Sequence, residues 1–253
     1  LRRALRPAGL ALLGGGAAWS VAELGIDPAQ LSPGFVLLNL FLLSPLILVL
    51  AAVTLRITAA SLGVELRLRT ALQTCATANV AELLPLPGGA MVRGAALMRA
   101  GAGASESARL VTLTALLTLA MALTLAGVSL ALLGAPPAAP VLAAGVGSIV
   151  ASLAALSRWV RRPLLGAMVL VRLTTMAVGV VRLWASFAMI GMVVAPQEAA
   201  LYTLATTLGA TVSVVPGGFG VNEAIAAGLA ALVAGPPAAA LLAVAANRAL
   251  GLV

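Results

Sequence analysis

The chain has 253 residues, of which 62% are hydrophobic and only 9% charged, and its formal net charge is +8. A soluble domain carries roughly 25% charged residues, so this composition predicts a protein whose solvent is lipid. It has no histidine, and Cys75 is its single cysteine, which excludes a histidine-based metal site, a histidine general base and an internal disulfide bond. We expect neither a metal nor a cofactor.

The basic residues are all arginines, and they gather at the ends of apolar runs. This distribution is typical of the cytoplasmic flanks of membrane helices, and it argues against nucleic acid as a partner despite the high net charge. The arginines interpreted as topology signals are Arg2, Arg3, Arg6, Arg56, Arg67, Arg69, Arg158, Arg161 and Arg162.

Taken in chain order, these flanks predict about six full spans. The first starts inside because an arginine-rich segment precedes it, and we interpret it as a retained span rather than a signal peptide. Pro45 is expected to kink the second span. The fourth ends at the basic sequence SRWVRRP, which predicts a cytoplasmic loop. The predicted spans cover about 7–21, 35–60, 105–134, 141–156, 163–194 and 236–253.

Two apolar segments between these spans are interrupted by Pro-Gly-Gly. The segment 70–103 must begin and end inside, and the segment 199–235 must begin and end outside. Each is too short for two full spans and a turn, so each predicts a broken hairpin of half-length helices that enters the membrane and returns. Such breaks are tolerated at membrane depth only where protein buries them or a wet cavity adjoins them.

The two interrupted segments also align with each other at an offset of 129 residues. Eleven of the 27 positions in 71–97 are identical to their partners, including Pro-Gly-Gly. Three spans separate the copies, so the second is inverted. The sequence therefore predicts an all-α polytopic membrane protein with about six full spans, two broken re-entrant hairpins and an inverted-topology repeat. Its single domain, 1–253, would contain repeat A at about 34–134 and repeat B at about 163–253.

Each Pro-Gly-Gly break should end one helix and begin another. Proline cannot continue a helix, and the glycines allow a sharp reversal and a close backbone approach. The new helix begins with unpaired N–H groups and the positive end of its dipole, which attract an anion such as phosphate. Two such helix starts facing each other predict an anion site near the membrane midplane. The residues expected there are Pro87, Gly88, Gly89, Pro216, Gly217, Gly218 and Gly220.

Polar and charged residues follow both breaks at nearly equivalent positions. Arg93 lies one turn beyond the first break, and Asn222 and Glu223 lie one turn beyond the second. Ionisable groups inside a bilayer are costly and are functional candidates for that reason. We expect Arg93 and Glu223 to pair across the pseudo-twofold axis. In the alternative interpretation, Glu223 complements the dipole of its own helix and Arg93 extends to the inner surface.

Further polar residues lie within the predicted membrane segments. Glu82 and Asn79 lie in the first arm of the first hairpin, where a structural role and a binding role both remain open. Arg182 lies deep in its span and is expected to pair with a carboxylate or a lipid phosphate. Arg172 is nearer the inner face and is expected to extend to it. Arg248 would contact a lipid headgroup or lie at the interface.

The stretches NVAELLPLPGGAMVRGAALMRAG, VSVVPGGFGVNEA and ANRAL resemble the membrane domain of the lysylphosphatidylglycerol synthase/flippase family. The resemblance begins at about residue 46. It implies a bacterial or archaeal inner-membrane protein that moves a polar or anionic lipid between leaflets. No soluble aminoacyl-transfer domain is present in this sequence, so we do not expect it to synthesise lysyl-lipid. By position, the resemblance implies roles for Pro216, Gly217, Gly218, Gly220 and Glu223, and for Asn79, Glu82, Pro87, Arg93 and Arg248.

The function expected is that of a flippase or transporter, not an enzyme, which moves an anionic phosphate-bearing lipid and binds its headgroup at the two breaks. The alternative is an ion-coupled secondary transporter of a small anionic solute. An enzyme acting on lipid phosphates would require a nucleophile or a metal cluster, and an accessory subunit would not require two costly breaks. The expected partners are membrane lipids, with a homo-oligomer or a separate lipid-modifying enzyme as further options. The expected location is the inner plasma membrane, with several spans and a cytoplasmic N-terminus.

Overall fold

The computed structural model describes residues 31–82, 88–212 and 220–252. Every regular element in those ranges is a helix. The predicted first span, 7–21, lies outside the described residues, and so do four residues of the two breaks. These four are Pro87, Pro216, Gly217 and Gly218.

Four helical stretches are long and apolar enough to cross a membrane. They are 33–61, α6 (Ala104–Leu132), α7 (Ala138–Ser157) and α8 (Arg162–Met189). The shortest has 20 residues, and at 1.5 Å per residue it matches a hydrocarbon core of about 30 Å. These stretches correspond to the second to fifth predicted spans. The described chain is therefore an all-helical protein with the character of a multi-pass membrane protein.

The helix expected to form the last full span lies within its predicted bounds of about 236–253. α11 (Pro237–Leu252) has 16 residues, which corresponds to about 24 Å along its axis and is less than the hydrocarbon thickness. The described residues thus contain four helices of spanning length. The prediction of about six full spans is not confirmed.

The first long stretch is irregular just before Pro45. It consists of α2 (Pro33–Leu37), a π-helix η2 (Leu38–Leu43) and α3 (Ser44–Ser61). Pro45 has no N–H to bond to the preceding turn, and the turn before it is widened, with the Ser44 N–H bonding to the carbonyl of Asn39. The irregularity expected at this proline is therefore a π-helical segment on its N-terminal side.

Two pairs of shorter helices occupy the interrupted segments. α4 (Leu68–Ala81) packs against α5 (Gly88–Arg99), and α9 (Pro196–Val212) packs against α10 (Val221–Leu232). α5 and α10 have 12 residues each, about 18 Å and roughly half a span. In each segment the two helices lie on either side of residues outside the described ranges, at the position where the break is predicted.

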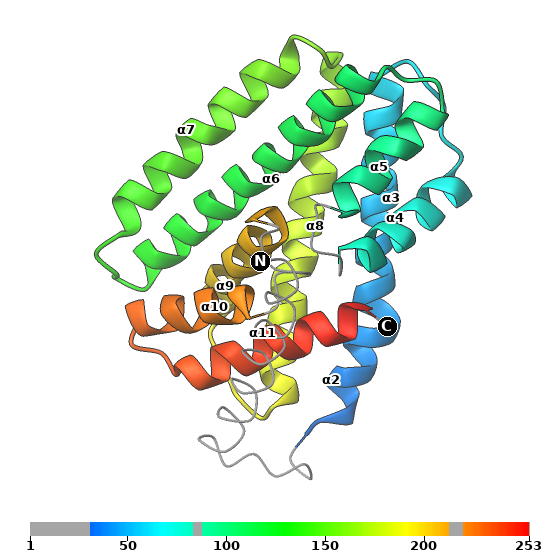
Figure 1. Cartoon of the computed structure of the whole chain (residues 1–253). Helices are drawn as coiled ribbons and strands as arrows, with labels where there is room; N and C mark the ends of the chain where they lie inside the picture. The colour runs from blue at the N-terminus through cyan, green and yellow to red at the C-terminus, as the bar shows by residue number, and fades with distance from the viewer. Residues whose placement is uncertain (1–30, 83–87, 213–219, 253) are drawn as a thin grey trace, which may run out of the picture.

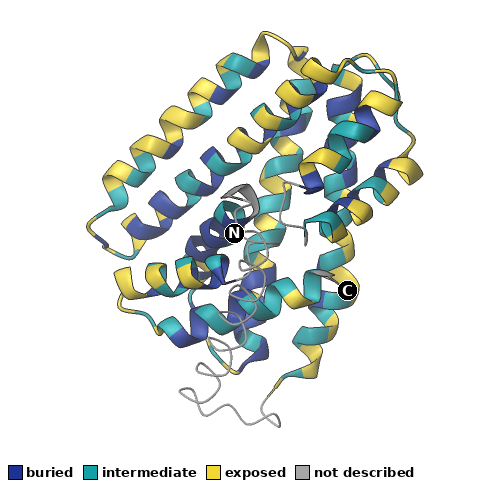
Figure 2. Cartoon of the chain, viewed as in Figure 1, coloured by how far each residue is buried: buried dark blue, intermediate teal, exposed yellow. Residues whose placement is uncertain are grey.

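The α6–α7 pair lies at one edge of the molecule, and α8 runs between it and α3 (Figure 1). α6 and α7 approach closely at glycines: a Cβ on Gly127 would lie 2.6 Å from Leu142 Cα, and one on Gly145 would lie 2.5 Å from Thr124 N. Small residues allow this kind of close helix packing in membranes. The helix α9 is the most enclosed, with every residue of 199–205 buried, whereas exposed residues dominate α7 (Figure 2).

Candidate functional site

The start of α10 holds a buried carboxylate whose two oxygens are both bonded. Gly220 precedes the helix with φ at 80°, a left-handed conformation that favours glycine. Its N–H donates to Glu223 Oε2 at 2.8 Å, and Arg248 Nη1 of α11 donates to Glu223 Oε1 at 3.2 Å. Glu223 is only 1% exposed. The carboxylate therefore caps its own helix and also ties α10 to α11, which packs against it (Figure 1).

A second ion pair lies in the first broken segment. Arg93 Nη2 of α5 donates to Glu82 Oε1, at the end of α4, across 3.1 Å. The glycines that begin α5 allow this approach: a Cβ on Gly88 would collide with the Ala81 carbonyl oxygen, and one on Gly89 would lie 2.7 Å from Glu82 Cγ. Glu82 thus lies against the first turn of α5, and Glu223 belongs to the first turn of α10.

The expected pairing of Arg93 with Glu223 is wrong. Each of these residues pairs elsewhere, Arg93 with Glu82 and Glu223 with Arg248. The reason is local: Glu82 precedes Arg93 by only 11 residues, and the packing of α4 against α5 places the two side chains together. Of the alternative interpretation, the capping of α10 by Glu223 is present. Arg93 does not extend to a surface unpaired, because its guanidinium bonds to Glu82.

The two ion pairs lie near each other. The negative charge of Glu82 acts on Arg248 as well as on Arg93. Whether the two hairpins converge on one site stays a prediction, and the charged partners differ from those expected.

Arg172 is a member of this region that sequence reasoning missed. It lies ten residues into α8, about 15 Å from the helix start and too far for its side chain to reach that end. Its Nε atom is buried without a hydrogen-bond partner among the described residues, and it lies close enough to Arg93 and Cys75 for electrostatic interaction. The expectation that it extends to the inner face is wrong. Its distance from the helix end was the signal available in the sequence.

Arg182 is buried on the same helix, with 8% of its surface exposed. Its Nη2 donates to the backbone carbonyl of Asn247 on α11 at 2.8 Å, and Gly251 leaves room for the guanidinium, because a Cβ there would lie 3.0 Å from Nη2. Its Nε has no hydrogen-bond partner in the described part of the chain. Within that part no carboxylate pairs with it, so the carboxylate partner considered from the sequence is not found.

Two asparagines differ in how they are placed. Asn222 is buried and lies directly against Gly209 of α9, where any Cβ would collide with its side chain, and its Oδ1 has no partner in the described ranges. Asn79 is half-buried on α4. A third, Asn39 of the π-helical segment, is fully buried and makes long hydrogen bonds of 3.5 Å to the Arg182 carbonyl and to Ser186 Oγ.

The interior region thus carries more positive than negative charge. Its described members comprise four arginines and two glutamates, an excess of two positive charges. Buried charges without a counter-ion are costly in a medium of low dielectric constant, so the arrangement favours an added anion. The members are Glu82, Arg93, Arg172, Glu223 and Arg248, together with Arg182, whose bond to the Asn247 carbonyl places it beside the residue before Arg248.

Comparisons of the chain with protein-family models, with curated proteins and with solved structures gave no match. The resemblance to the lysylphosphatidylglycerol synthase/flippase family therefore stays a prediction from its motifs.

Proposed function

We propose that the protein moves an anionic, phosphate-bearing lipid between membrane leaflets. One observation carries the proposal: Arg182 is buried and Arg172 is half-buried with a buried Nε, and neither forms an ion pair with a carboxylate in the described residues. Arginine presents a planar set of N–H donors that match phosphate oxygens, so such residues suit a headgroup phosphate. The lipid tails would remain in the bilayer while the headgroup passes through the charged interior.

The headgroup would bind where the two broken segments converge. Both described helix starts already face a carboxylate of the protein, Glu82 at α5 and Glu223 at α10. A phosphate entering this region would compete with these carboxylates for Arg93 and Arg248. In this proposal, the two ion pairs hold the empty site closed, and exchange of partners accompanies binding.

The membrane topology proposed is the one predicted from the sequence, with six full spans, two re-entrant hairpins and an inverted repeat in an inner membrane. The helix bounds support the repeat, because an offset of 129 carries α4 onto 197–210 and α9 covers Pro196–Val212. The pocket described below supports the orientation. It brings together the end of α3, the start of α6 and the residues after α7, all predicted to be cytoplasmic.

The test is leaflet exchange in liposomes that contain the full chain. Headgroup-labelled phosphatidylglycerol is compared with a labelled zwitterionic lipid for the wild type, Arg172→Gln and Arg182→Gln. Arg69→Gln is the matched control, because Arg69 is exposed. Loss of one charge-assisted hydrogen bond costs about 1.5–3 kcal/mol, so we expect exchange of the anionic lipid to fall roughly tenfold or more in both interior variants.

The control variant should exchange lipid like the wild type. If the folded wild type exchanges no lipid, or if both lipids exchange equally and the interior variants change nothing, the lipid proposal fails. Uptake of a small anion by the same liposomes, lost in Arg182→Gln, would instead establish the alternative of an anionic-solute transporter.

A further inference from the structure

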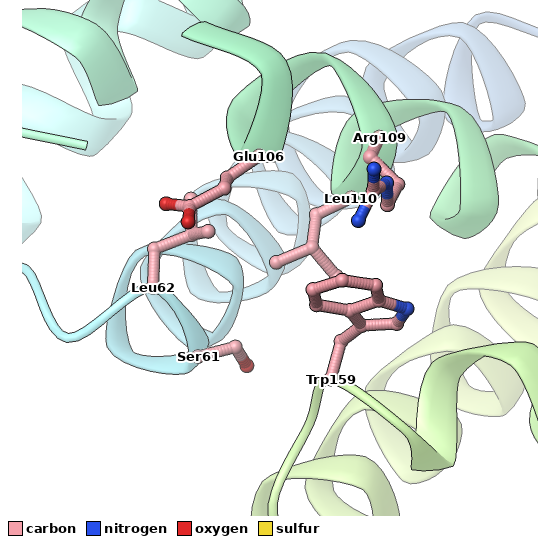
Figure 3. Close-up of a pocket in the computed structure, with 6 residues that line it drawn as sticks. All are labelled: Ser61, Leu62, Glu106, Arg109, Leu110 and Trp159. Carbon is pink, nitrogen blue, oxygen red and sulfur yellow. The ribbon is translucent and has the colours of Figure 1, made fainter. Parts of the chain in front are cut away.

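A polar pocket lies at the ends of α3 and α7 and the start of α6, so residues from three separate parts of the chain line it (Figure 3). Its volume is about 180 Å³. A single water needs roughly 10–15 Å³ of such space, so the pocket admits a group of several non-hydrogen atoms. Its lining residues are Ser61 and Leu62 at the end of α3, Glu106, Arg109 and Leu110 of α6, and Trp159 after α7.

Arg109 is held in place by an aromatic ring. Its guanidinium carbon lies 4.2 Å from the centre of the Trp159 ring. Stacking uses the face of the guanidinium and leaves the N–H donors at its edge available for a bidentate acceptor such as phosphate. Arg109 forms no ion pair in the described part of the chain. The pocket therefore presents an oriented cation whose donors are not used by a carboxylate.

Glu106 supplies the opposite charge without neutralising Arg109. The two lie three residues apart on α6, a spacing at which helical ion pairs commonly form, yet no salt bridge joins them. The Glu106 carboxylate lies instead toward the helix start, where a Cβ on Gly103 would be 3.1 Å from Oε2. Figure 3 shows Glu106 and Arg109 on opposite sides of the pocket, with Leu110 between them. The pocket thus separates a fixed negative charge from a fixed positive one.

The Ser61 hydroxyl adds an acceptor to this arrangement. It donates to the carbonyl of Ile57 at 2.8 Å, so its oxygen offers only lone pairs to a ligand. A primary ammonium group carries three donors, which a carboxylate and a hydroxyl oxygen can accept. The polar groups of the pocket are therefore complementary to a ligand with a phosphate and an ammonium group a few atoms apart.

We propose that this pocket binds the headgroup of a phospholipid of the phosphoethanolamine class, with the phosphate on Arg109 and the ammonium on Glu106 and Ser61. A lipid is favoured over a free solute because half-exposed Trp159 and flanking arginines are features of a membrane interface. Leu62 and Leu110 give the pocket an apolar side on which the start of the acyl chains can lie. The site is distinct from the interior charges, and the proposal does not depend on transport.

The test is native mass spectrometry of the full chain in detergent, titrated separately with phosphatidylethanolamine, phosphatidylglycerol and phosphatidylcholine. The wild type should retain phosphatidylethanolamine in preference to the other two lipids. Loss of the charged partner in Arg109→Gln should weaken binding of all three lipids, and Glu106→Gln should remove the preference, each by about tenfold for one charge-assisted contact. Matched controls are Glu65→Gln, between α3 and α4, and Arg69→Gln, at the start of α4, both of which alter exposed charges.

Two outcomes would overturn the proposal. One is equal retention of the three lipids by the wild type. The other is an unchanged preference in Glu106→Gln with the same thermal unfolding as the wild type. Soluble glycerophosphoethanolamine serves as a competitor: if it displaces the lipid at equal concentration, the ligand is a free solute and the lipid assignment is wrong. Failure of these tests would leave the transport measurements of Arg172 and Arg182 unaffected.

Discussion

The two interior ion pairs allow a direct test of how burial governs their contribution to stability. In the pair between Glu223 and Arg248, the side chains are 2% and 13% exposed; in the pair between Glu82 and Arg93, they are 42% and 32% exposed. Removing one partner of a buried pair leaves an uncompensated charge, which costs about 3–5 kcal/mol. In the wet cavity that the proposed function requires, water screens the exposed part of the second pair, and removing one partner of such a pair costs roughly 0–1 kcal/mol. Arg248→Ala should therefore destabilise the protein by several kcal/mol, and Arg93→Ala by about 1 kcal/mol or less.

The measurement is the free energy of unfolding in detergent micelles, followed by the intrinsic fluorescence of the tryptophans or by circular dichroism. The double variant Arg248→Ala/Glu223→Gln separates loss of the pair from the presence of an unpaired charge. It should be more stable than Arg248→Ala alone, because a neutral amide costs less to bury than a carboxylate. The Gly220 N–H that bonds to Glu223 Oε2 retains an acceptor in this variant. Equal losses in Arg248→Ala and Arg93→Ala, or no recovery in the double variant, would refute the reasoning.

Two further predictions concern glycines at close helix contacts. Gly209→Ala should destabilise the protein by about 1–3 kcal/mol through overpacking, because the new Cβ would collide with the Asn222 side chain. Adding Asn222→Ala should restore most of the unfolding free energy, and a failure to do so would place the strain elsewhere. Gly145→Val should loosen α6 from α7, whereas Gly147→Val on the same helix should be tolerated because nothing lies within 4 Å of its Cβ position. Thermal unfolding of the two valine variants measures the difference, and equal melting temperatures would contradict the packing described.

The sequence by itself determined the solvent of this protein and most of its long helices. Four of the predicted spans are helices of spanning length, because about 20 consecutive apolar residues between charged flanks leave a chain in lipid few alternatives to a helix. The positions of the two breaks were also readable, since proline and paired glycines end a helix by their own backbone chemistry. The start of α5 at Gly88 follows from that chemistry alone.

The partners of the charged side chains were decided only by the tertiary structure. Arg93 bonds to Glu82 because Gly88 and Gly89 let α5 approach α4 closely, and Glu223 bonds to Arg248 because α11 folds back across α10. The predicted repeat makes Arg93 and Glu223 nearly equivalent in position, but equivalence along the chain does not fix which guanidinium reaches which carboxylate. An ion pair forms only within a few ångströms, and that distance is set by how the helices pack.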